Sequence, residues 1–187
     1  MAEERTMIDV KRLRAYRIER VQAELVAAGI GAILLFDPIN IRYATDTSNM
    51  QVWCTHNAVR YCFIPTEGPV TLFEFHGCDH LAEGFDTLQE VRSAIGWFYF
   101  GAGSRVQEKA KQWAAEIADL VRAHGGCNRR LAVDKCEPEG IAALQAEGVE
   151  IFNGQEVTEL ARRIKSPEEI KAMRIAIAVN DEGFRRM

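Results

Sequence analysis

The sequence has no excess of positive charge, no long hydrophobic run and no pairing pattern among its cysteines. Lysine and arginine total 23 against 27 aspartates and glutamates, a formal net charge of −4, which argues against the basic surface that nucleic-acid binding needs. The longest apolar run, residues 30–36, is far too short to span a membrane, and residues 1–11 hold no apolar stretch of a secretory leader. The five scattered cysteines form no Cys-x-x-Cys pair, which is typical of reduced thiols. We therefore expect a cytoplasmic protein with no membrane span and no nucleic-acid partner.

The sequence also lacks the short motifs of common catalytic sites, since it has no Gly-x-Ser-x-Gly elbow, Walker loop or His-Glu-x-x-His helix. Residues 76–80, His-Gly-Cys-Asp-His, hold four possible metal ligands. So short a segment cannot surround an ion alone, and we interpret it as a polar loop. Residues 100–104 have only two of the three glycines of a dinucleotide-binding turn and indicate a flexible strand-to-helix connection. We predict no catalytic residue, no metal ligand and no cofactor within this chain.

The sequence alternates between helix and strand patterns. Its 187 residues, 48% of them hydrophobic, are enough to form one large domain with a hydrophobic core. Apolar residues recur every three or four positions in residues 18–28, which predicts a helix, and residues 30–36 resemble a buried strand. Residues 40–43 are predicted as a short turn, and residues 45–57 as a long polar loop. The strands predicted at residues 58–64 and 70–75 form a hairpin.

The second half continues the alternation. We predict a strand at residues 97–100 and a helix that begins at Ser104, with Gln107 completing a capping box. Short strands and helices then follow to residue 164. The hairpin together with later crossovers predicts an α/β layered domain with a mixed central β-sheet flanked by helices. The side chains expected in its core are Ile33, Leu35, Phe63, Leu72, Trp113, Ile117, Leu131 and Val133.

The last stretch differs from the rest. Residues 166–169, Ser-Pro-Glu-Glu, are a strong helix start, with serine as N-cap and glutamate completing a capping box. An apolar stripe follows, and the sequence ends at Arg-Arg-Met, residues 185–187, with no glycine, proline or tail there. The helix either folds back on the sheet or begins a second domain, and the missing stop signal favours the second. We therefore expect one domain at residues 1–164, with residues 165–187 as the linker and first helix of a further domain.

The candidate binding site is the polar segment 45–57 and the residue that follows it closely, Arg60. Trp53 offers a large apolar face, His56 can donate a hydrogen bond and titrate near neutral pH, and Arg60 can meet a carboxylate with two hydrogen bonds. Long ordered loops in compact domains are usually functional. The alternative is that Trp53 caps the core and Arg60 pairs with a carboxylate at the sheet edge.

Two motifs resemble a known family. Residues 36–45, Phe-Asp-Pro-Ile-Asn-Ile-Arg-Tyr-Ala-Thr, resemble a segment of the creatinase/prolidase N-terminal domain, and residues 162–170, Arg-Arg-Ile-Lys-Ser-Pro-Glu-Glu-Ile, resemble its junction with a catalytic domain. The resemblance implies a ribonuclease H-like fold in a homodimeric two-domain protein. It also implies a C-terminal catalytic domain, outside this sequence, that holds two divalent metal ions. In several members of that family a loop from this domain reaches the partner subunit's active site and its small-molecule or dipeptide substrate, and residues 45–60 are the matching region here.

The sequence departs from the family pattern at residues 44–46, Ala-Thr-Asp, where the family has Leu-Thr-Gly. The run from residue 36 to residue 57, which includes Asn-Met-Gln at 49–51, Trp53 and His-Asn at 56–57, is closer to the branch that contains the dimethylsulfoniopropionate lyases. Our first hypothesis is the non-catalytic N-terminal domain of a Xaa-Pro dipeptidase or aminopeptidase. The alternatives are the same domain from a dimethylsulfoniopropionate lyase or creatinase-like amidinohydrolase, and a standalone α/β binding or dimerisation module.

Overall fold

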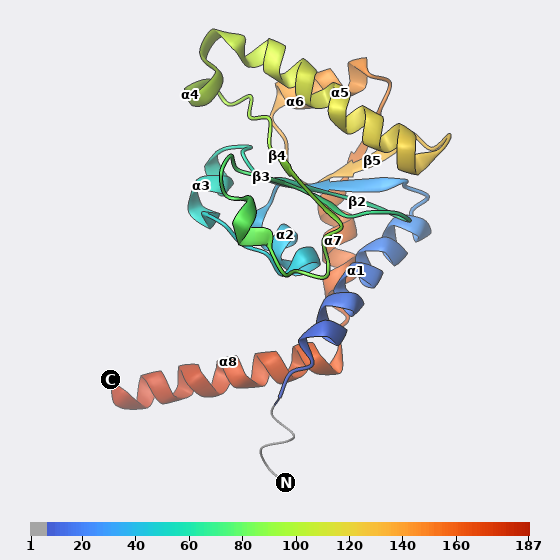
Figure 1. Ribbon diagram of the computed structural model, residues 1–187. Helices are drawn as coiled ribbons and strands as arrows, with labels where there is room; N and C mark the ends of the chain where they lie inside the picture. The colour runs from blue at the N-terminus through green and yellow to red at the C-terminus, as the bar shows by residue number, and fades with distance from the viewer. Residues whose placement is uncertain (1–6) are drawn as a thin grey trace.

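A computed structural model describes residues 7–187 and contains a six-stranded β-sheet with helices on both faces (Figure 1). The strands are β1 (Ala32–Leu35), β2 (Tyr61–Pro65), β3 (Thr71–Glu74), β4 (Glu90–Ser93), β5 (Arg130–Val133) and β6 (Glu150–Asn153). The helices are α1 (Val10–Ala27), α2 (Pro38–Thr45), α3 (Gln51–His56), α4 (Tyr99–Ala102), α5 (Val106–Gly125), α6 (Pro138–Ala146), α7 (Gly154–Arg163) and α8 (Pro167–Arg186), with 3-10 turns η1 (Asp79–Ala82) and η2 (Gly103–Arg105).

The sheet is mixed, as the sequence predicted. Its strand order is β4-β3-β2-β1-β5-β6. Strand β2 is antiparallel to β1, and β3 is antiparallel to β2. The other neighbours are parallel: β5 to β1, β6 to β5, and β4 to β3. Parallel neighbours need crossover connections, which α6 supplies between β5 and β6 and a loop with η1 supplies between β3 and β4. The predicted α/β layered architecture is confirmed.

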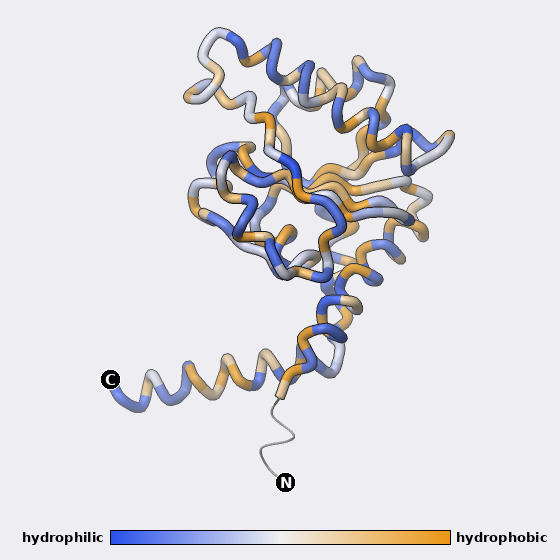
Figure 2. The backbone as a smooth tube through the Cα atoms, in the orientation of Figure 1, coloured by the Kyte–Doolittle hydropathy of each residue, from blue (hydrophilic) through white to orange (hydrophobic). Residues whose placement is uncertain are grey.

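Two hydrophobic clusters lie on opposite faces of the sheet. The successive residues Leu34 and Leu35 of β1 point to opposite faces and belong to different clusters. Both are buried because helices cover both faces of the sheet. One face packs against α5 and α6, and the other packs against α1, α2 and α7 (Figure 1). The hydrophobic residues accordingly concentrate along the strands and the inner helix faces (Figure 2). The eight predicted core residues are all buried: Ile33, Leu35, Phe63, Leu72, Trp113, Ile117, Leu131 and Val133.

Two predictions about the segment after β1 were wrong. Residues 40–43 lie in the helix α2 rather than in a turn, because the Asp37 side chain accepts hydrogen bonds from two backbone N–H groups and Pro38 takes the first helical position. The polar segment 45–57 is not an irregular loop throughout, because α3 occupies its second half.

The prediction of a strand at residues 97–100 was also wrong. Trp97 is buried against Trp113, with ring centroids 4.1 Å apart. Phe98 is the N-cap of the short helix α4, and Tyr99 and Phe100 form its first turn. The nearest strand is instead β4, one of the two edge strands, whose charged residues on either side of Val91 suit a half-exposed position. The expected cap at Ser104 is absent, since η2 precedes α5 and no side chain caps that helix.

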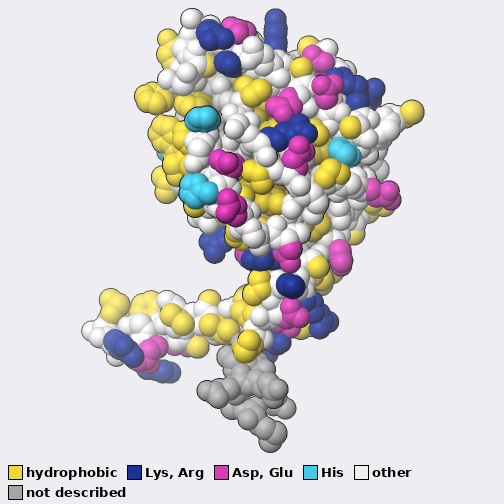
Figure 3. All heavy atoms as spheres, in the orientation of Figure 1, with side chains coloured by type: hydrophobic (Ala, Val, Ile, Leu, Met, Phe, Trp, Pro, Cys, Tyr) yellow, Lys and Arg dark blue, Asp and Glu magenta, His cyan; other side chains and the backbone are white. Residues whose placement is uncertain are grey.

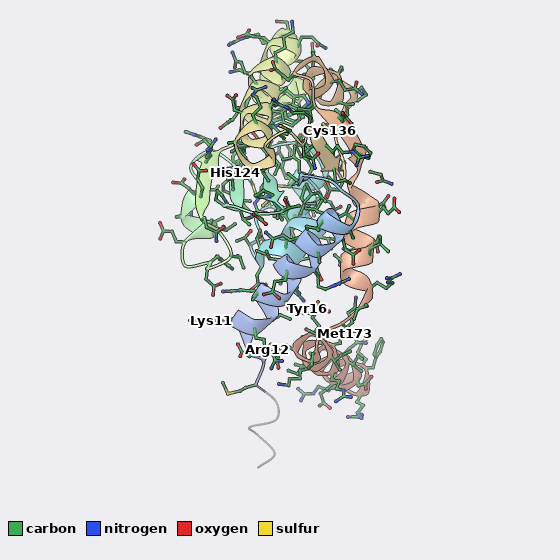
Figure 4. All side chains as sticks on the ribbon, turned by 90° about the vertical axis from the view of Figure 1, so that its right-hand side faces the viewer. Lys11, Arg12, Tyr16, His124, Cys136 and Met173 are labelled. Atoms are coloured by element: carbon green, nitrogen blue, oxygen red, sulfur yellow. The ribbon has the colours of Figure 1, made fainter. Side chains whose placement is uncertain are left out.

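Helix α8 begins with the predicted capping box, in which Ser166 and Glu169 exchange side-chain to backbone hydrogen bonds. It does not fold back on the sheet but extends away from the body of the molecule (Figure 1). Its first turn is fixed to α1, because Arg17 pairs with Glu169 at 3.0 Å and the backbone N–H of Asp9 donates to Glu168 at 2.9 Å. Figure 4 shows this junction from the side. The apolar side chains of the helix are exposed: Ile170, Met173, Ile177 and Phe184.

Across residues 7–187, none of the helices combines the length and apolar character needed to cross a lipid bilayer.

Gly154 marks the closest approach of α7 to β5. A Cβ atom at this position would come within 2.6 Å of the backbone carbon of Val133 and 2.7 Å of the backbone nitrogen of Asp134. We expect Gly154→Ala to lower the free energy of unfolding by about 1–3 kcal/mol, because the backbone must move to relieve the overlap. Gly183→Ala is the matched control, since nothing lies within 4 Å of its Cβ position and alanine favours a helix. Urea unfolding of both variants measures the difference, and equal stability would contradict the expectation.

Candidate functional site

The candidate site lies on the segment that joins α2 to β2. The connection from α2 to α3 turns twice through left-handed backbone conformations, at Asp46 with φ 64° and at Met50 with φ 37°. Residues with a Cβ atom adopt this region rarely, so the surrounding structure must hold the segment in place. The helix α3 that follows carries Trp53 and His56 on its exposed side.

Arg60 lies beneath this segment rather than at the surface. It directly precedes β2, and because Tyr61 pairs with Phe73 across the sheet, Arg60 lies opposite Glu74. Its Nε donates to Oε2 of Glu74 at 2.8 Å, and each side chain is only 1% exposed. Its Nη2 donates to Oγ1 of Thr47 at 2.7 Å. This placement corrects the expectation that Arg60 meets a substrate carboxylate, because the buried guanidinium already has a carboxylate within the fold.

The Glu74 carboxylate completes a polar network under the segment. Its Oε1 accepts hydrogen bonds from Nδ2 of Asn49 at 2.9 Å and from the backbone N–H of Phe75 at 2.9 Å. The hydroxyls of Thr45 and Thr47 lie 2.7 Å apart in the same buried region. Each member of the ion pair therefore also forms a hydrogen bond with one residue of the connection that leads into α3, Arg60 with Thr47 and Glu74 with Asn49.

Trp53 is part of an aromatic surface that the sequence did not predict. Its side chain is 39% exposed, and its ring meets Phe98 and Phe100 edge-on, with centroids 6.4 and 6.0 Å apart. Tyr99 and Phe100 are 78% and 84% exposed. We call Trp53, Phe98, Tyr99 and Phe100 the aromatic surface. Hydrophobic side chains gather along this edge of the molecule, beside α3 and α4 (Figure 3).

The only sequence signal for this surface was the aromatic run that follows Trp97, which we interpreted as a strand. Exposed aromatic clusters are uncommon on monomers and typically mark binding surfaces. His56 lies on the same helix as Trp53 and is exposed. The structure thus places Trp53 against the rings of Phe98 and Phe100, keeps His56 exposed on the same helix, and buries Arg60 away from the surface.

The thiol of Cys54, between Trp53 and His56, is buried, and burial raises its pKa to about 11. It donates toward the backbone oxygen of Asn49 at 3.4 Å. A thiol with this pKa carries almost no thiolate at neutral pH, so Cys54 is not suited to act as a nucleophile.

A second polar cluster lies where β1 and β5 end. The Asp134 carboxylate accepts hydrogen bonds from the backbone N–H of Phe36 at 2.7 Å and from Nδ2 of Asn40 at 2.9 Å. Burial raises the pKa of Asp134, and these donors oppose the rise. The Oδ1 of Asn40 accepts from Nη1 of Arg162 at 3.0 Å. The two sequence motifs that resemble a known family therefore meet in space, and they hold α2 against α7.

The arrangement offers no metal centre within residues 7–187, where no group of three or more His, Cys, Asp or Glu side chains could hold an ion. The motif at residues 76–80 follows β3 and leads into η1 as a surface segment, with both of its histidines exposed. A dinuclear metal site therefore has no ligand set in this part of the chain.

Comparisons with known proteins match this fold and sequence. Residues 17–164 match the sequence profile described as the creatinase/prolidase N-terminal domain. Over 179 residues the chain is 41% identical to the dimethylsulfoniopropionate lyase DddP of Roseobacter denitrificans, covering 96% of this chain and 40% of that protein. The chain spans about 40% of the length of the curated relatives it matches.

Two solved structures show the same fold. The prolidase from Thermococcus sibiricus has a TM-score of 0.65 and 21% identity, covering 92% of this chain and 43% of that one. The N-terminal domain of the cytoplasmic peptidase PepQ from Mycobacterium tuberculosis has a TM-score of 0.55 and 18% identity, covering 78% of this chain and 98% of that one. The profile match confirms the family resemblance of the sequence motifs, whereas the solved structures, at identities this low, show the fold alone and say nothing about substrate.

Proposed function

This chain belongs to the creatinase/prolidase N-terminal domain family, and from that membership we propose that it is the non-catalytic N-terminal domain of a longer dimethylsulfoniopropionate lyase. The observation that carries the proposal is the identity to DddP, which extends over nearly the whole chain. The peptidase structures support the fold alone. The Xaa-Pro peptidase that we first expected therefore becomes the alternative, together with a creatinase-like amidinohydrolase and a standalone module.

In this proposal the catalytic chemistry belongs to a C-terminal domain that follows α8. Two divalent metal ions held there by Asp, His and Glu residues would act as Lewis acids on the substrate. Residues 165–187 are the linker and first helix of that domain. The exposed apolar side chains of α8 support this role, because a helix with an apolar face needs a surface to cover it.

The N-terminal domain contributes to a homodimer in which it covers the partner's active site. The aromatic surface is the part of this chain that suits such a contact, since it is apolar, exposed and built on the segment that carries Trp53 and His56. We propose that Trp53 closes the substrate pocket with its apolar face and that His56 donates a hydrogen bond near it.

The full-length parent protein, loaded with divalent metal, tests the assignment. We expect it to release dimethyl sulfide from dimethylsulfoniopropionate and to leave a Xaa-Pro dipeptide and creatine intact. Hydrolysis of the dipeptide or of creatine without release of dimethyl sulfide would assign the parent to that other activity and refute the lyase. Inactivity on all three substrates in a protein with bound metal would refute the lyase assignment. A coding sequence that stops at Met187 would instead favour the standalone module. Sedimentation of the same sample tests the homodimer.

Trp53→Ala in the full-length parent is expected to lower kcat/KM on the order of tenfold, which corresponds to about 1.4 kcal/mol of lost contact in the transition state. The melting temperature should change little, because Trp53 is partly exposed. Val52→Ala is the matched control, since Val52 lies on the same helix and is 80% exposed. Unchanged kcat/KM with a lowered melting temperature would show that Trp53 is structural.

A further inference from the structure

The buried ion pair between Arg60 and Glu74 makes hydrogen bonds to residues outside the pair, in addition to the contact between the two charges. Removing two charges from water is costly, and well-packed apolar residues at such a place are often at least as stabilising. Here each partner reaches beyond the pair to the connecting segment, which we define as residues 46–50 between α2 and α3. The guanidinium of Arg60 holds Thr47, and the carboxylate of Glu74 holds Asn49.

The connecting segment needs such support because its backbone is unfavourable on its own. It begins and ends with residues in the left-handed region, Asp46 and Met50, neither of which is glycine. Met50 is also the N-cap of α3, yet no side chain caps that helix. A helix of six residues without a cap has little stability of its own, so its direction depends on what holds the residues before it.

Helix α3 has contacts on both its buried and its exposed side, and on the exposed side the backbone oxygen of Thr55 accepts a hydrogen bond from Nζ of Lys135. Cys54 is buried and donates to the backbone oxygen of Asn49, so it is attached to the same residue that Glu74 holds. Trp53 faces outward and touches the rings of α4. The chain of contacts therefore runs from the sheet, through Glu74 and Asn49, to the helix that presents Trp53.

We propose that Arg60 and Glu74 are positioning residues that act through Thr47 and Asn49 to fix the direction in which α3 presents Trp53. The pair couples the end of the hairpin β2–β3 to the exposed aromatic surface. This inference deepens the proposed function, because Trp53 is the residue assigned there to the substrate. Its test reads the surroundings of Trp53 rather than turnover, so either idea can fail while the other holds.

The test uses this chain labelled with 5-fluorotryptophan, whose three tryptophans give three fluorine NMR signals. Trp53→Phe assigns the Trp53 signal. Asn49→Ala removes the link to Glu74, while Glu74 keeps Arg60 and the backbone N–H of Phe75 as partners. We expect the Trp53 signal to move toward the position of a solvent-exposed indole, and the signals of the buried Trp97 and Trp113 to stay in place.

Thr55→Ala is the matched control, because Thr55 lies on α3 but bonds only within that helix through its hydroxyl, to the backbone oxygen of Gln51. It should leave the Trp53 signal unchanged. Thr47→Val removes the link to Arg60 instead and should shift the Trp53 signal in the same direction as Asn49→Ala. If Trp53 keeps its signal in both variants while the chain stays folded, the pair does not position α3 and the proposal is overturned. If all three signals shift together in both, the network supports only the general fold, which also overturns it.

Discussion

Replacing Trp113 with alanine is expected to lower the free energy of unfolding by about 3–5 kcal/mol, the usual range for removing a buried aromatic ring. Trp113 is fully buried on α5 at the centre of an aromatic cluster with Phe36, Tyr61 and Trp97. Its indole N–H has no hydrogen-bond partner among residues 7–187, so the loss is one of packing. Urea unfolding followed by circular dichroism measures it.

Tyr99→Ala provides the comparison for Trp113→Ala, because Tyr99 is also aromatic but lies exposed on α4. A surface substitution of this kind usually changes stability by less than about 0.5 kcal/mol. A loss below about 1 kcal/mol for Trp113→Ala would mean that the aromatic cluster is not the packed centre of this face of the sheet.

The sequence predicted the core well because long helices and buried strands show a clear spacing of apolar residues. In α5, apolar residues at helical spacing placed Trp113 and Ile117 on the buried side, and both are buried. The continuous apolar run of β1 predicted a strand covered on both faces, which the helices confirm. The capping box at Ser166 was readable because it consists of neighbouring residues whose contacts are local.

The candidate site was only partly predictable because its geometry depends on distant residues. Trp53, His56 and Arg60 were named together as binding candidates, with a carboxylate partner for Arg60 at the sheet edge as the alternative. For Arg60 the alternative holds, and the sequence could not decide it because the partner, Glu74, lies on another strand. The sequence around Arg60 does not show whether its side chain faces solvent or the interior at the start of β2. The aromatic surface was missed for a related reason, since an aromatic run predicts a strand unless tertiary contacts, here those of Trp97, impose another conformation.

Breaking the buried ion pair with Arg60→Met is expected to lower the free energy of unfolding by about 3–5 kcal/mol. The substitution keeps much of the volume of the side chain but leaves the Glu74 carboxylate buried without a cation, which is the costly state. Asn49 and the backbone N–H of Phe75 still donate to it, but neither supplies a compensating charge. Urea unfolding at neutral pH measures the loss.

The double variant Arg60→Met/Glu74→Gln separates this penalty from the general loss of contacts. A neutral glutamine can still accept a hydrogen bond from Asn49, so no uncompensated charge stays buried, and the double variant should be more stable than Arg60→Met alone. The two residues are in direct contact, and such pairs give interaction energies of about 0.5–3 kcal/mol in a double-mutant cycle. The cycle is closed by the single variant Glu74→Gln. If the stability losses of Arg60→Met and Glu74→Gln add up to the loss of the double variant, the two charges do not stabilise each other, and the pair cannot hold α3 as a unit.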